Sequence, residues 1–522
     1  MRAARLLDAQ SAELLGFEWL VAAVAPLSSY GTRLFTAIEP FAPGQEAAAQ
    51  ARASQIARIA AQLSRERVAE MSAALDAVAD VSGAVARASL GETLEDADLL
   101  ELRRFCETLE RLDLAAAATR GLGELLAIGR TAGAEFYLAD AFDEELASQR
   151  AELARTQAEL DAVLGRERAA VAAALHRDDL PGDEFIVMRA ELAGPLPQGV
   201  RVAREAPTYL LCELEHGVDA LDALTRRDGC ARDVAMREES VRARLSASVA
   251  QRTSELGAAA VALAELDVTL GAVRFTQRYR CNAPEIVAES GVAFEAARFL
   301  PVEAELRVAG RDFVPIDLAL RGAAVLTGPN MGGKSVTLQT CGFVALLAAF
   351  GLPVPAASAR LALFDEIAWL GLGRDEREPL LSSFAGELVA LREVLARASE
   401  RLLLLADEFA RTTTPHEGRA LVVALLSRMR ERRADGLVAT HLQGIARDAG
   451  VPHFAVRGLH AIPPGCGDGD LNDALRRLAA AMDYRIVRVA GDEAPQADAI
   501  ALAELLGVDA AFVEAAYRAL SQ

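Results

Sequence analysis

Apolar residues recur at helical spacing through the first part of the chain and form short runs in the last part. The periodicity predicts helices that prolines and glycines separate; they cover residues 15–24, 47–63, 66–86 and 94–114. After Pro284, short apolar runs typical of strands alternate with helical segments. The predicted strands are residues 302–308, 323–326, 401–406, 436–439 and 484–489. We therefore expect an all-α part followed by an α/β part, with a last helix over residues 510–520.

A long polar helix is predicted over residues 144–175, because Leu146, Leu153 and Leu160 lie seven residues apart, the spacing of a coiled-coil seam. Residues 181–214 then read as β structure, and a second long helix is predicted from about Val234. Two long helices around a small β tip predict an antiparallel arm. Two ordinary bundle helices with an interposed loop are the alternative.

The strand predicted at residues 323–326 leads into Thr-Gly-Pro-Asn-Met-Gly-Gly-Lys-Ser and then a helix from Val336 to Phe350. Strand, glycine-rich turn and helix in that order indicate a phosphate-binding loop. Backbone N–H groups and the helix dipole bind the phosphates, Lys334 reaches the terminal phosphates, and Ser335 is placed to hold Mg²⁺. The loop residues expected at the nucleotide are Gly328, Pro329, Asn330, Met331, Gly332, Gly333, Lys334, Ser335 and Val336.

Lys334 is the only lysine among the 522 residues, and the other basic residues are all arginine. An ammonium is a compact point charge on a flexible stem, whereas a planar guanidinium does not fit the same narrow loop. The one lysine that remains therefore supports a working phosphate site.

Acidic residues and a histidine follow two further predicted strands. Leu402 to Leu405 lead into Asp407 and Glu408; Asp407 is expected to hold Mg²⁺ and Glu408 to activate the attacking water. Exposed acids on a helix are the alternative. His441 follows the strand at residues 436–439 and is expected to sense the terminal phosphate, with a satisfied core histidine as the alternative.

Ser382 and Ser383 precede another predicted helix and, with Glu387, resemble a helix capping box. Between a phosphate-binding loop and an Asp-Glu strand, the segment gains a second interpretation. Ser382 would donate its hydroxyl to the nucleotide of a second subunit, so the protein would act as a dimer.

The net charge of −20 counts against a large, non-specific DNA interface. Over residues 140–200 there are 6 arginines and 13 acids, so the arm would repel a phosphate backbone unless Arg189, Arg201 and Arg204 lie together. The six cysteines are far apart, which favours a reducing cytoplasm over zinc or disulfide frameworks. Neither a signal peptide nor a membrane span is expected.

Several motifs together resemble the MutS mismatch-repair family. They are the phosphate-binding loop with its Asn-Met pair, Pro353 to Ala356, Ser382-Ser383-Phe384 with Glu387, Asp407-Glu408 with Arg411 and Thr413, and Ala439-Thr440-His441. Glu265 to Val268 and Phe313 to Leu318 extend the resemblance upstream. It is strong over residues 265–520 and weak before them.

The resemblance implies an α/β P-loop ATPase domain of the ABC type, after an all-α core with long lever helices and a clamp tip. The expected domains are a helical core (1–138), a lever arm (139–275) with its tip at about 181–214, the ATPase domain (276–480) and a C-terminal dimerisation segment (481–522). ATP and Mg²⁺ are the implied cofactors, and Phe313 is the implied stacking partner of adenine.

This sequence departs from the family pattern at several places. The chain starts in the helical core, which implies a shortened form without the mismatch-reading domain. The family's Gly-Arg-Gly-Thr reads Ala410-Arg411-Thr412-Thr413, and its Gly-Arg before the signature serine reads Leu380-Leu381. Both segments cross the dimer interface of the family, so the rate of hydrolysis is open.

We expect an ATP-hydrolysing clamp, either a homodimer or a heterodimer with a related MutS-like subunit, that binds DNA. The alternative is an ATP-driven remodelling factor for a protein client, such as a reactivase of a cobalamin-dependent aminomutase. The acidic arm favours that alternative.

Overall fold

The computed structural model forms two compact units. It describes residues 1–129, 138–192, 194–329, 332–371, 383–397, 400–459, 482–489, 500, 503–504 and 508–520. The first unit joins Met1–Asp76 to Ala264–Gln522, and the second is Ala77–Leu263. The four-domain division expected from the sequence has its boundaries elsewhere, after residues 138, 275 and 480, and stays a prediction. Helix α11 (Thr253–Tyr279) contributes residues to both units.

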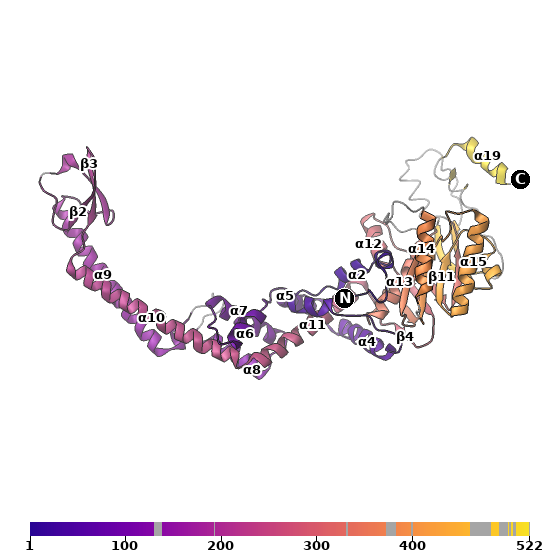
Figure 1. Ribbon diagram of the computed structural model, residues 1–522, viewed down its shortest axis with the longest axis horizontal. Coiled ribbons are helices and arrows are strands. Elements are labelled where there is room, and N and C mark those ends of the chain that lie inside the picture. Colours follow the sequence, from indigo (N-terminus) through magenta and orange to yellow (C-terminus); the bar gives the residue numbers. More distant parts are fainter. Residues whose placement is uncertain are drawn as a thin grey trace. The chain divides into compact units, whose positions relative to one another are not determined.

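A six-stranded sheet, ordered β13-β12-β7-β11-β10-β9, forms the centre of the first unit (Figure 1). All neighbouring pairs are parallel except β12 and β13, which are antiparallel. The strands are β7 (Ala323–Thr327), β9 (Glu366–Gly371), β10 (Leu402–Asp407), β11 (Asp435–Ala439), β12 (His453–Leu459) and β13 (Met482–Arg488). The strands predicted at 323–326, 401–406, 436–439 and 484–489 are thereby confirmed.

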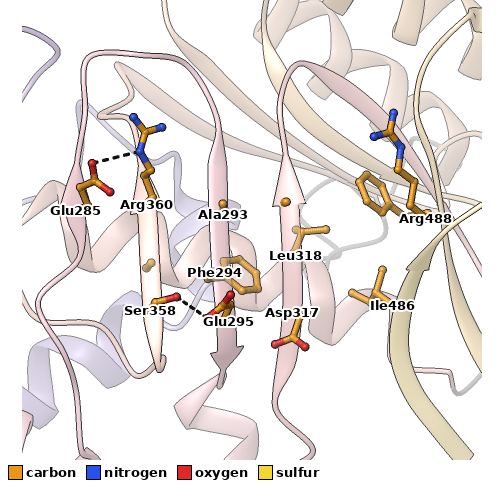
Figure 2. A pocket seen from close by; sticks show the side chains of 13 residues that line it. Glu285, Ala293, Phe294, Glu295, Asp317, Leu318, Ser358, Arg360, Ile486 and Arg488 are labelled. Atoms are coloured by element: carbon orange, nitrogen blue, oxygen red, sulfur yellow. Dashed lines mark hydrogen bonds and ion pairs between the residues drawn. The ribbon is translucent and has the colours of Figure 1, made fainter.

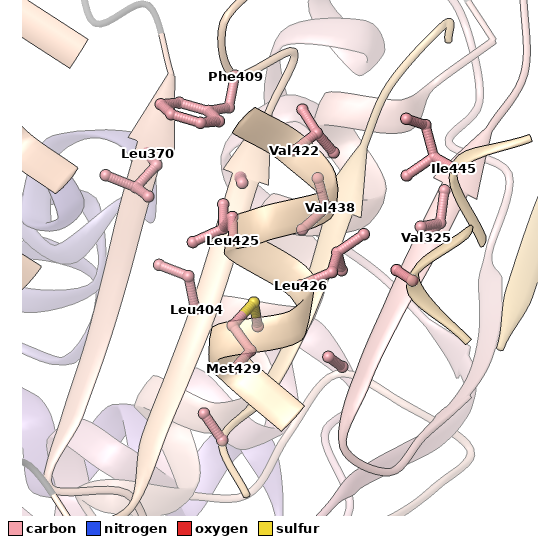
Figure 3. Packing of buried hydrophobic residues seen from close by; sticks show 14 of the residues in the cluster. Val325, Leu370, Leu404, Phe409, Val422, Leu425, Leu426, Met429, Val438 and Ile445 are labelled. Carbon is pink, nitrogen blue, oxygen red and sulfur yellow. The ribbon is translucent and has the colours of Figure 1, made fainter. Parts of the chain in front are cut away.

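Helices cover both faces of this sheet. Successive leucines of β10 point to opposite faces, so each face of this strand is apolar. Leu404 packs with α15 (Pro415–Arg432) in a buried cluster that also contains Phe409 and Val438 (Figure 3). Leu405 faces the other side, where its Cδ1 lies 2.8 Å from the position that a Cβ on Gly342 would take. Gly342 lies in α13 (Lys334–Ala349), so this helix approaches the sheet closely.

The N-terminal segment covers β9, the edge strand of the sheet. The N–H of Ile367 donates to the carbonyl of Leu6 at 2.8 Å, and the N–H of Trp369 donates to Ser11 Oγ at 2.9 Å. An uncovered edge strand exposes unpaired backbone groups, so these contacts both complete the sheet and fix residues 1–14 to it.

A second sheet, ordered β4-β8-β5-β6, and several helices complete the first unit. The strands are β4 (Glu285–Ile286), β5 (Val292–Ala297), β6 (Ile316–Leu320) and β8 (Ser358–Leu361). The other helices are α1 (Ala9–Leu14), α2 (Phe17–Val24), α3 (Ser29–Thr36), α4 (Glu46–Gln62), α5 (Arg65–Asp76), α12 (Leu300–Val308), α14 (Ser383–Ala396), α16 (Ile445–Ala449) and α19 (Ala510–Leu520). The helix predicted over residues 510–520 is confirmed.

The strand predicted at residues 302–308 is wrong, because these residues form α12. Apolar and polar residues alternate there, which mimics a strand. Pro301 lies at the start of the helix, where its missing N–H is tolerated. Glu303 and Arg307, one helical turn apart, form an ion pair of 3.0 Å.

Helix α11 is tied to the N-terminal residues by a buried carboxylate. Asp267 is 0 % exposed, and it accepts hydrogen bonds from the N–H of Leu27 at 3.0 Å and from the N–H and Oγ of Ser28 at 2.7 and 2.6 Å. Among the described residues, α11 alone is long and apolar enough to cross a membrane, and 56 % of that stretch is buried in the protein. We therefore interpret it as a core helix.

The second unit contains a helical cluster and a pair of long helices. The cluster consists of α6 (Ser82–Ser89), α7 (Asp96–Arg111) and α8 (Ala117–Leu126). The helix predicted over residues 66–86 is therefore two helices, α5 and α6, with a break at 77–81. The long helices are α9 (Glu144–Ala174) and α10 (Val218–Ala250). The second long helix begins sixteen residues before the predicted Val234, because small buried residues such as Ala220 and Ala223 carry its first turns.

Helices α9 and α10 run antiparallel beside each other (Figure 1). Asp143 pairs with Arg237 at 2.8 Å, and at the other end Glu167 Oε1 accepts the N–H of Gly217 at 3.0 Å. The segment that connects α9 to α10 in the sequence forms an antiparallel sheet, ordered β1-β3-β2. Its strands are β1 (Glu184–Met188), β2 (Val200–Glu205) and β3 (Tyr209–Leu214). The predicted β tip is thus a sheet rather than a loop.

Candidate nucleotide-binding site

Three parallel strands bring the predicted chemical residues to one edge of the six-stranded sheet. In the strand register, Leu326 of β7 lies beside Ala439 of β11, and Ala439 lies beside Asp407 of β10. The residues that follow these strands are therefore neighbours. The phosphate-binding loop, the Asp-Glu pair and the Thr-His pair meet there, although they are far apart in the sequence.

The glycines of the phosphate-binding loop have conformations or contacts that exclude a side chain. Gly328 has φ +154°, and a Cβ on it would lie 2.9 Å from Val456 Cβ. Gly333 has φ +84° and forms the cap at the start of α13. Backbone groups can therefore turn inward at the end of a helix that starts at Lys334, the arrangement that binds phosphate. Asn330 and Met331 lie outside the described residues.

Lys334 lies inside the loop. Its side chain is 6 % exposed, and Nζ donates hydrogen bonds to the carbonyls of Gly328 at 2.9 Å and Pro329 at 3.1 Å. Burial lowers the pKa of the ammonium group, and the carboxylates of Glu408 and Asp407 oppose that shift. The lysine is thus held where a phosphate in the loop would meet its charge.

Ser335 and Asp407 form the predicted metal-binding pair. Ser335 Oγ donates a hydrogen bond of 2.6 Å to Asp407 Oδ2. Burial raises the pKa of the Asp407 carboxyl, while the hydrogen bond from Ser335 and the charge of Lys334 lower it. A hydroxyl and a carboxylate are the hard oxygen ligands that suit Mg²⁺, and a cation favours the charged form of a buried carboxylate. The residues present therefore fit a magnesium ion.

Glu408 lies between two cations. Its Oε1 is 3.7 Å from Lys334 Nζ, and its Oε2 accepts a hydrogen bond of 2.7 Å from Arg411 Nη1. The Glu408 side chain is 16 % exposed. A carboxylate at the end of a buried strand, beside the phosphate lysine, can accept a proton from water close to the phosphates.

His441 joins Glu408 at the same small hollow. The hollow has a volume of about 40 Å³, and its lining residues are Glu408, Phe409, Ala410, Arg411, Thr413, Pro415, Gly418, Thr440, His441 and Leu442. His441 is exposed there, which argues against the satisfied core histidine considered above. Thr440, in contrast, is buried, and its N–H donates to the carbonyl of Leu326 at 3.0 Å.

Tyr484 is a site residue whose contact the sequence did not predict. Its Cδ1 lies 3.3 Å from the position that a Cβ on Gly333 would take. Burial raises the pKa of the Tyr484 hydroxyl, and the charge of Arg311 opposes this shift. Arg311 precedes Phe313 by two residues, so the half-buried Phe313 belongs to a segment near this ring. Ser382 lies outside the described residues.

A larger groove of about 440 Å³ lies over β5, β6, β8 and β13 (Figure 2). Several of its charged groups have partners within the protein: Arg360 pairs with Glu285 at 3.2 Å, and Ser358 Oγ donates to Glu295 at 3.0 Å. Asp317 accepts the N–H of Ala296 at 2.7 Å. The phosphate-binding loop is not part of its lining, so we do not assign the nucleotide to this groove.

Comparison with known proteins identifies the family. Residues 324–521 match the family model of MutS domain V. The chain is 32 % identical over 448 residues to Endonuclease MutS2 of Anaeromyxobacter sp.. It is also 31 % identical over 258 residues to DNA mismatch repair protein MutS of Nitrobacter hamburgensis. The chain belongs to the MutS family.

The alignment with these MutS relatives is partial. The match to the Anaeromyxobacter protein covers 77 % of this chain and 53 % of that protein, and the match to the Nitrobacter protein covers 45 % and 28 %. Endonuclease MutS2 of Pelotomaculum thermopropionicum is 33 % identical over 39 % of this chain and 26 % of that protein. The chain thus spans about half or less of the length of these relatives.

One departure from the MutS pattern has a structural counterpart. Ala410 stands at a position where the pattern has glycine, and its φ is +61°. This left-handed region is easily reached by glycine and is unfavourable for alanine. The turn after Asp407 and Glu408 therefore has a conformation that suits glycine, although alanine stands there in this chain.

Proposed function

We propose that this MutS family chain binds ATP with Mg²⁺ and hydrolyses it to ADP and phosphate. The observation that carries the proposal is the convergence of two residue pairs at one sheet edge. Ser335 Oγ is 2.6 Å from Asp407 Oδ2, and Lys334 Nζ is 3.7 Å from Glu408 Oε1. Few structural roles require a buried lysine, a hydroxyl and two carboxyl groups next to a glycine-rich loop.

Each residue has a distinct task in this proposal. Ser335 and Asp407 would hold the magnesium ion, which when bound neutralises charge on the phosphates. Lys334 would exchange its carbonyl partners for the terminal phosphates and stabilise their charge. Glu408 would orient the attacking water and take its proton. His441 would donate a hydrogen bond to the terminal phosphate from the far side of the hollow.

The adenine would lie near Phe313 and Tyr484. Tyr484 packs against the start of α13 at Gly333, beside the loop that would carry the phosphates. An aromatic ring provides a flat apolar face for a base. Loss of ATP affinity in Tyr484→Ala and Phe313→Ala, with a smaller change in Tyr484→Phe, would support this placement. Unchanged affinity in both alanine variants would argue against it.

A Glu408→Gln variant tests the hydrolysis directly. We expect it to bind ATP as the wild-type protein does and to hydrolyse it at least ~100-fold more slowly, the range found when one charge-stabilising group is removed. Glu431→Gln is a matched control, because within the described ranges Glu431 forms only a surface pair with Arg428 at the end of α15. Hydrolysis at the normal rate in Glu408→Gln would contradict the assignment.

We further propose that the active form is a dimer in which Ser382 completes the site of the other subunit. Either two copies of this chain or one copy and a related subunit would satisfy this arrangement. Light scattering of Glu408→Gln with and without Mg²⁺-ATP tests it, because trapped ATP should stabilise the dimer. A monomer in both conditions, at concentrations where wild type hydrolyses ATP, would exclude it.

DNA is the proposed target of the arm formed by α9, α10 and the β tip, acting as lever and clamp. The names of the relatives support this: one is a DNA mismatch repair protein, and the others are endonucleases. Fluorescence anisotropy with duplex, mismatched and branched DNA at rising salt tests it, with and without ATP. Binding to phosphates weakens steeply with salt.

The charge of the tip favours a second candidate, a protein client in the cytoplasm. Arg189 pairs with Glu205 at 2.7 Å, and Arg201 pairs with Glu213, so their charge is already balanced. Ile186 is 49 % exposed on the same sheet. The relatives named above are a DNA mismatch repair protein and endonucleases, so DNA remains our first candidate. Absence of DNA binding at any salt, by a chain that hydrolyses ATP, would favour the client.

A further inference from the structure

The turn that carries Glu408 contains two residues with an unfavourable backbone conformation. Glu408 has φ +49° and Ala410 has φ +61°, and neither is glycine. The left-handed region is unfavourable for residues that have a side chain, because the Cβ atom crowds the backbone there. Two such residues within three positions do not hold this shape by local preference. Contacts from the surrounding protein must maintain it.

Three of those contacts lie within the strand ends and the core. The N–H of Glu408 donates to the carbonyl of Ala439 at 3.0 Å, and the N–H of Arg411 donates to the carbonyl of Glu408 at 3.2 Å. Phe409 is 2 % exposed and inserts its ring into the buried cluster under α15 (Figure 3). These contacts hold Glu408, Phe409 and Arg411 in place, but none of them is made by the backbone N–H of Ala410.

A carboxyl group from another helix holds Ala410. The N–H of Ala410 donates a hydrogen bond of 2.8 Å to Glu387 Oε2. Glu387 lies in α14 and is 5 % exposed. On the same side of α14, Phe384 and Leu391 pack against the cluster that contains Phe409. Helix α14 and the turn are thus joined by apolar packing and by this one polar contact.

Glu387 is an unfavourable residue if its role is only to fill space. Its Oε1 is buried and has no hydrogen-bond partner in the part of the chain that the structure describes. Burial raises the pKa of this carboxyl group, and the hydrogen bond from Ala410 opposes the shift. An apolar side chain would avoid the desolvation of an unpaired oxygen. The hydrogen bond to the N–H of Ala410 is the favourable contact that offsets this desolvation.

We propose that Glu387 is a positioning residue for Glu408, which it orients by holding the N–H of Ala410 and so the left-handed turn. The inference rests on the proposed ATP hydrolysis, in which Glu408 activates water. In this chain the contact has added weight, because alanine replaces the glycine of the family pattern at residue 410. Glycine would keep the turn accessible without help, whereas alanine needs the bond.

The decisive measurements are kcat and ATP affinity for variants of Glu387. Glu387→Ala removes the acceptor, so we expect kcat to fall about 10-fold or more while the Kd for a non-hydrolysable ATP analogue stays within about 2-fold. Glu387→Gln keeps an acceptor oxygen of the same reach and should retain most of the activity. Glu393→Gln, on the same helix with a side chain 55 % exposed, is the control.

Two further variants separate positioning from general damage. In a Glu408→Gln background, adding Glu387→Ala should leave the residual kcat unchanged, because the group that it positions is gone. Adding Ala410→Gly to Glu387→Ala should restore much of the lost activity, because glycine adopts the turn unaided. A merely structural role would lower the residual rate as well and would show no such rescue.

Hydrogen exchange at Ala410 gives a readout that does not depend on activity. Its amide should be protected in the wild-type protein and in Glu408→Gln, and it should exchange at least ~10-fold faster in Glu387→Ala. Unchanged exchange, or equal loss of affinity and kcat in Glu387→Ala, would overturn the inference. Failure of the proposed function looks different, because wild type would then not hydrolyse ATP, or Glu408→Gln would hydrolyse it normally.

Discussion

The Ser335 hydroxyl donates a hydrogen bond of 2.6 Å to Asp407 Oδ2, which joins the first turn of α13 to the end of β10. Both oxygens suit Mg²⁺. We expect Ser335→Ala and Asp407→Asn each to lower kcat at least ~100-fold and to shift the Mg²⁺ dependence to higher concentration. The measurement is ATP hydrolysis over a magnesium titration, with excess chelator as the zero point.

Ser89→Ala is the control for these variants, because Ser89 is an exposed serine at the end of α6, in the second unit. Its magnesium titration should overlay that of the wild-type protein. If Asp407→Asn instead kept both the normal rate and the normal magnesium dependence, another set of residues would have to hold the metal.

Lys334→Arg tests whether the only lysine is retained for its shape. Nζ is enclosed by the carbonyls of Gly328 and Pro329, and a guanidinium is wider than an ammonium group. Loss of one charge-assisted hydrogen bond of about 1.5–3 kcal/mol corresponds to roughly 10- to 100-fold weaker ATP binding. Isothermal titration with ATP measures it. Wild-type affinity in Lys334→Arg would show that positive charge alone is sufficient.

The local part of the site could be predicted from the sequence, because its signal lies in adjacent residues. The phosphate-binding loop, Asp407-Glu408 and Thr440-His441 each follow an apolar run, and β7, β10 and β11 are present as expected. The structure adds that the three strands are parallel neighbours, which brings their ends together. Candidate site residues can therefore be predicted from the sequence when they directly follow buried strands.

Contacts between distant segments could not be predicted in the same way. Glu387 meets Ala410 across 23 residues, and nothing in either segment indicates the other. Tyr484 reaches Gly333 from the last strand of the sheet. Residues 302–308 show the opposite case, in which a local pattern misleads. Their apolar and polar residues alternate as in a strand, but they form α12, which starts near Pro301 and contains an ion pair within one turn.

Asp143 at the start of α9 should make the arm sensitive to acid. Its side chain is 7 % exposed and accepts hydrogen bonds from Arg237 at 2.8 and 2.9 Å, from Arg244 at 3.1 Å and from the N–H of Leu146 at 3.1 Å. The bonds from Arg237, and then those from Leu146 and Arg244, hold the pKa of Asp143 well below its usual value, against burial. A lowered folded-state pKa stabilises the fold above the unfolded pKa of about 4, and this stability is lost as the pH falls through the folded value.

Asp143→Asn should therefore weaken the first turn of α9 at neutral pH, and the difference from wild type should stay constant down to about pH 5 and shrink as the pH falls below about 4. Hydrogen-exchange protection of residues 145–148, corrected for the intrinsic rate at each pH, measures it. Asp161→Asn is the control on the same helix, because Asp161 is exposed and accepts only from Gln157 among its described contacts. A difference that stayed constant with pH would mean that Asp143 acts through packing rather than through its charge.

Asp267 should be the most sensitive single position in α11. Its carboxylate is fully buried and receives both backbone N–H groups of residues 27 and 28 and the hydroxyl of Ser28. Asp267→Ala would leave these donors buried without a partner, at a cost of about 3 kcal/mol. Ser28→Ala removes a hydroxyl that also accepts the N–H of Gly31 at the start of α3, so it leaves one donor unpaired and should cost about 1 kcal/mol. Glu265→Ala, an exposed position on the same helix, should change the urea midpoint little. The decrease in the urea midpoint should follow the number of donors that each variant leaves unpaired. Equal midpoints for Asp267→Ala and Glu265→Ala would contradict that reasoning.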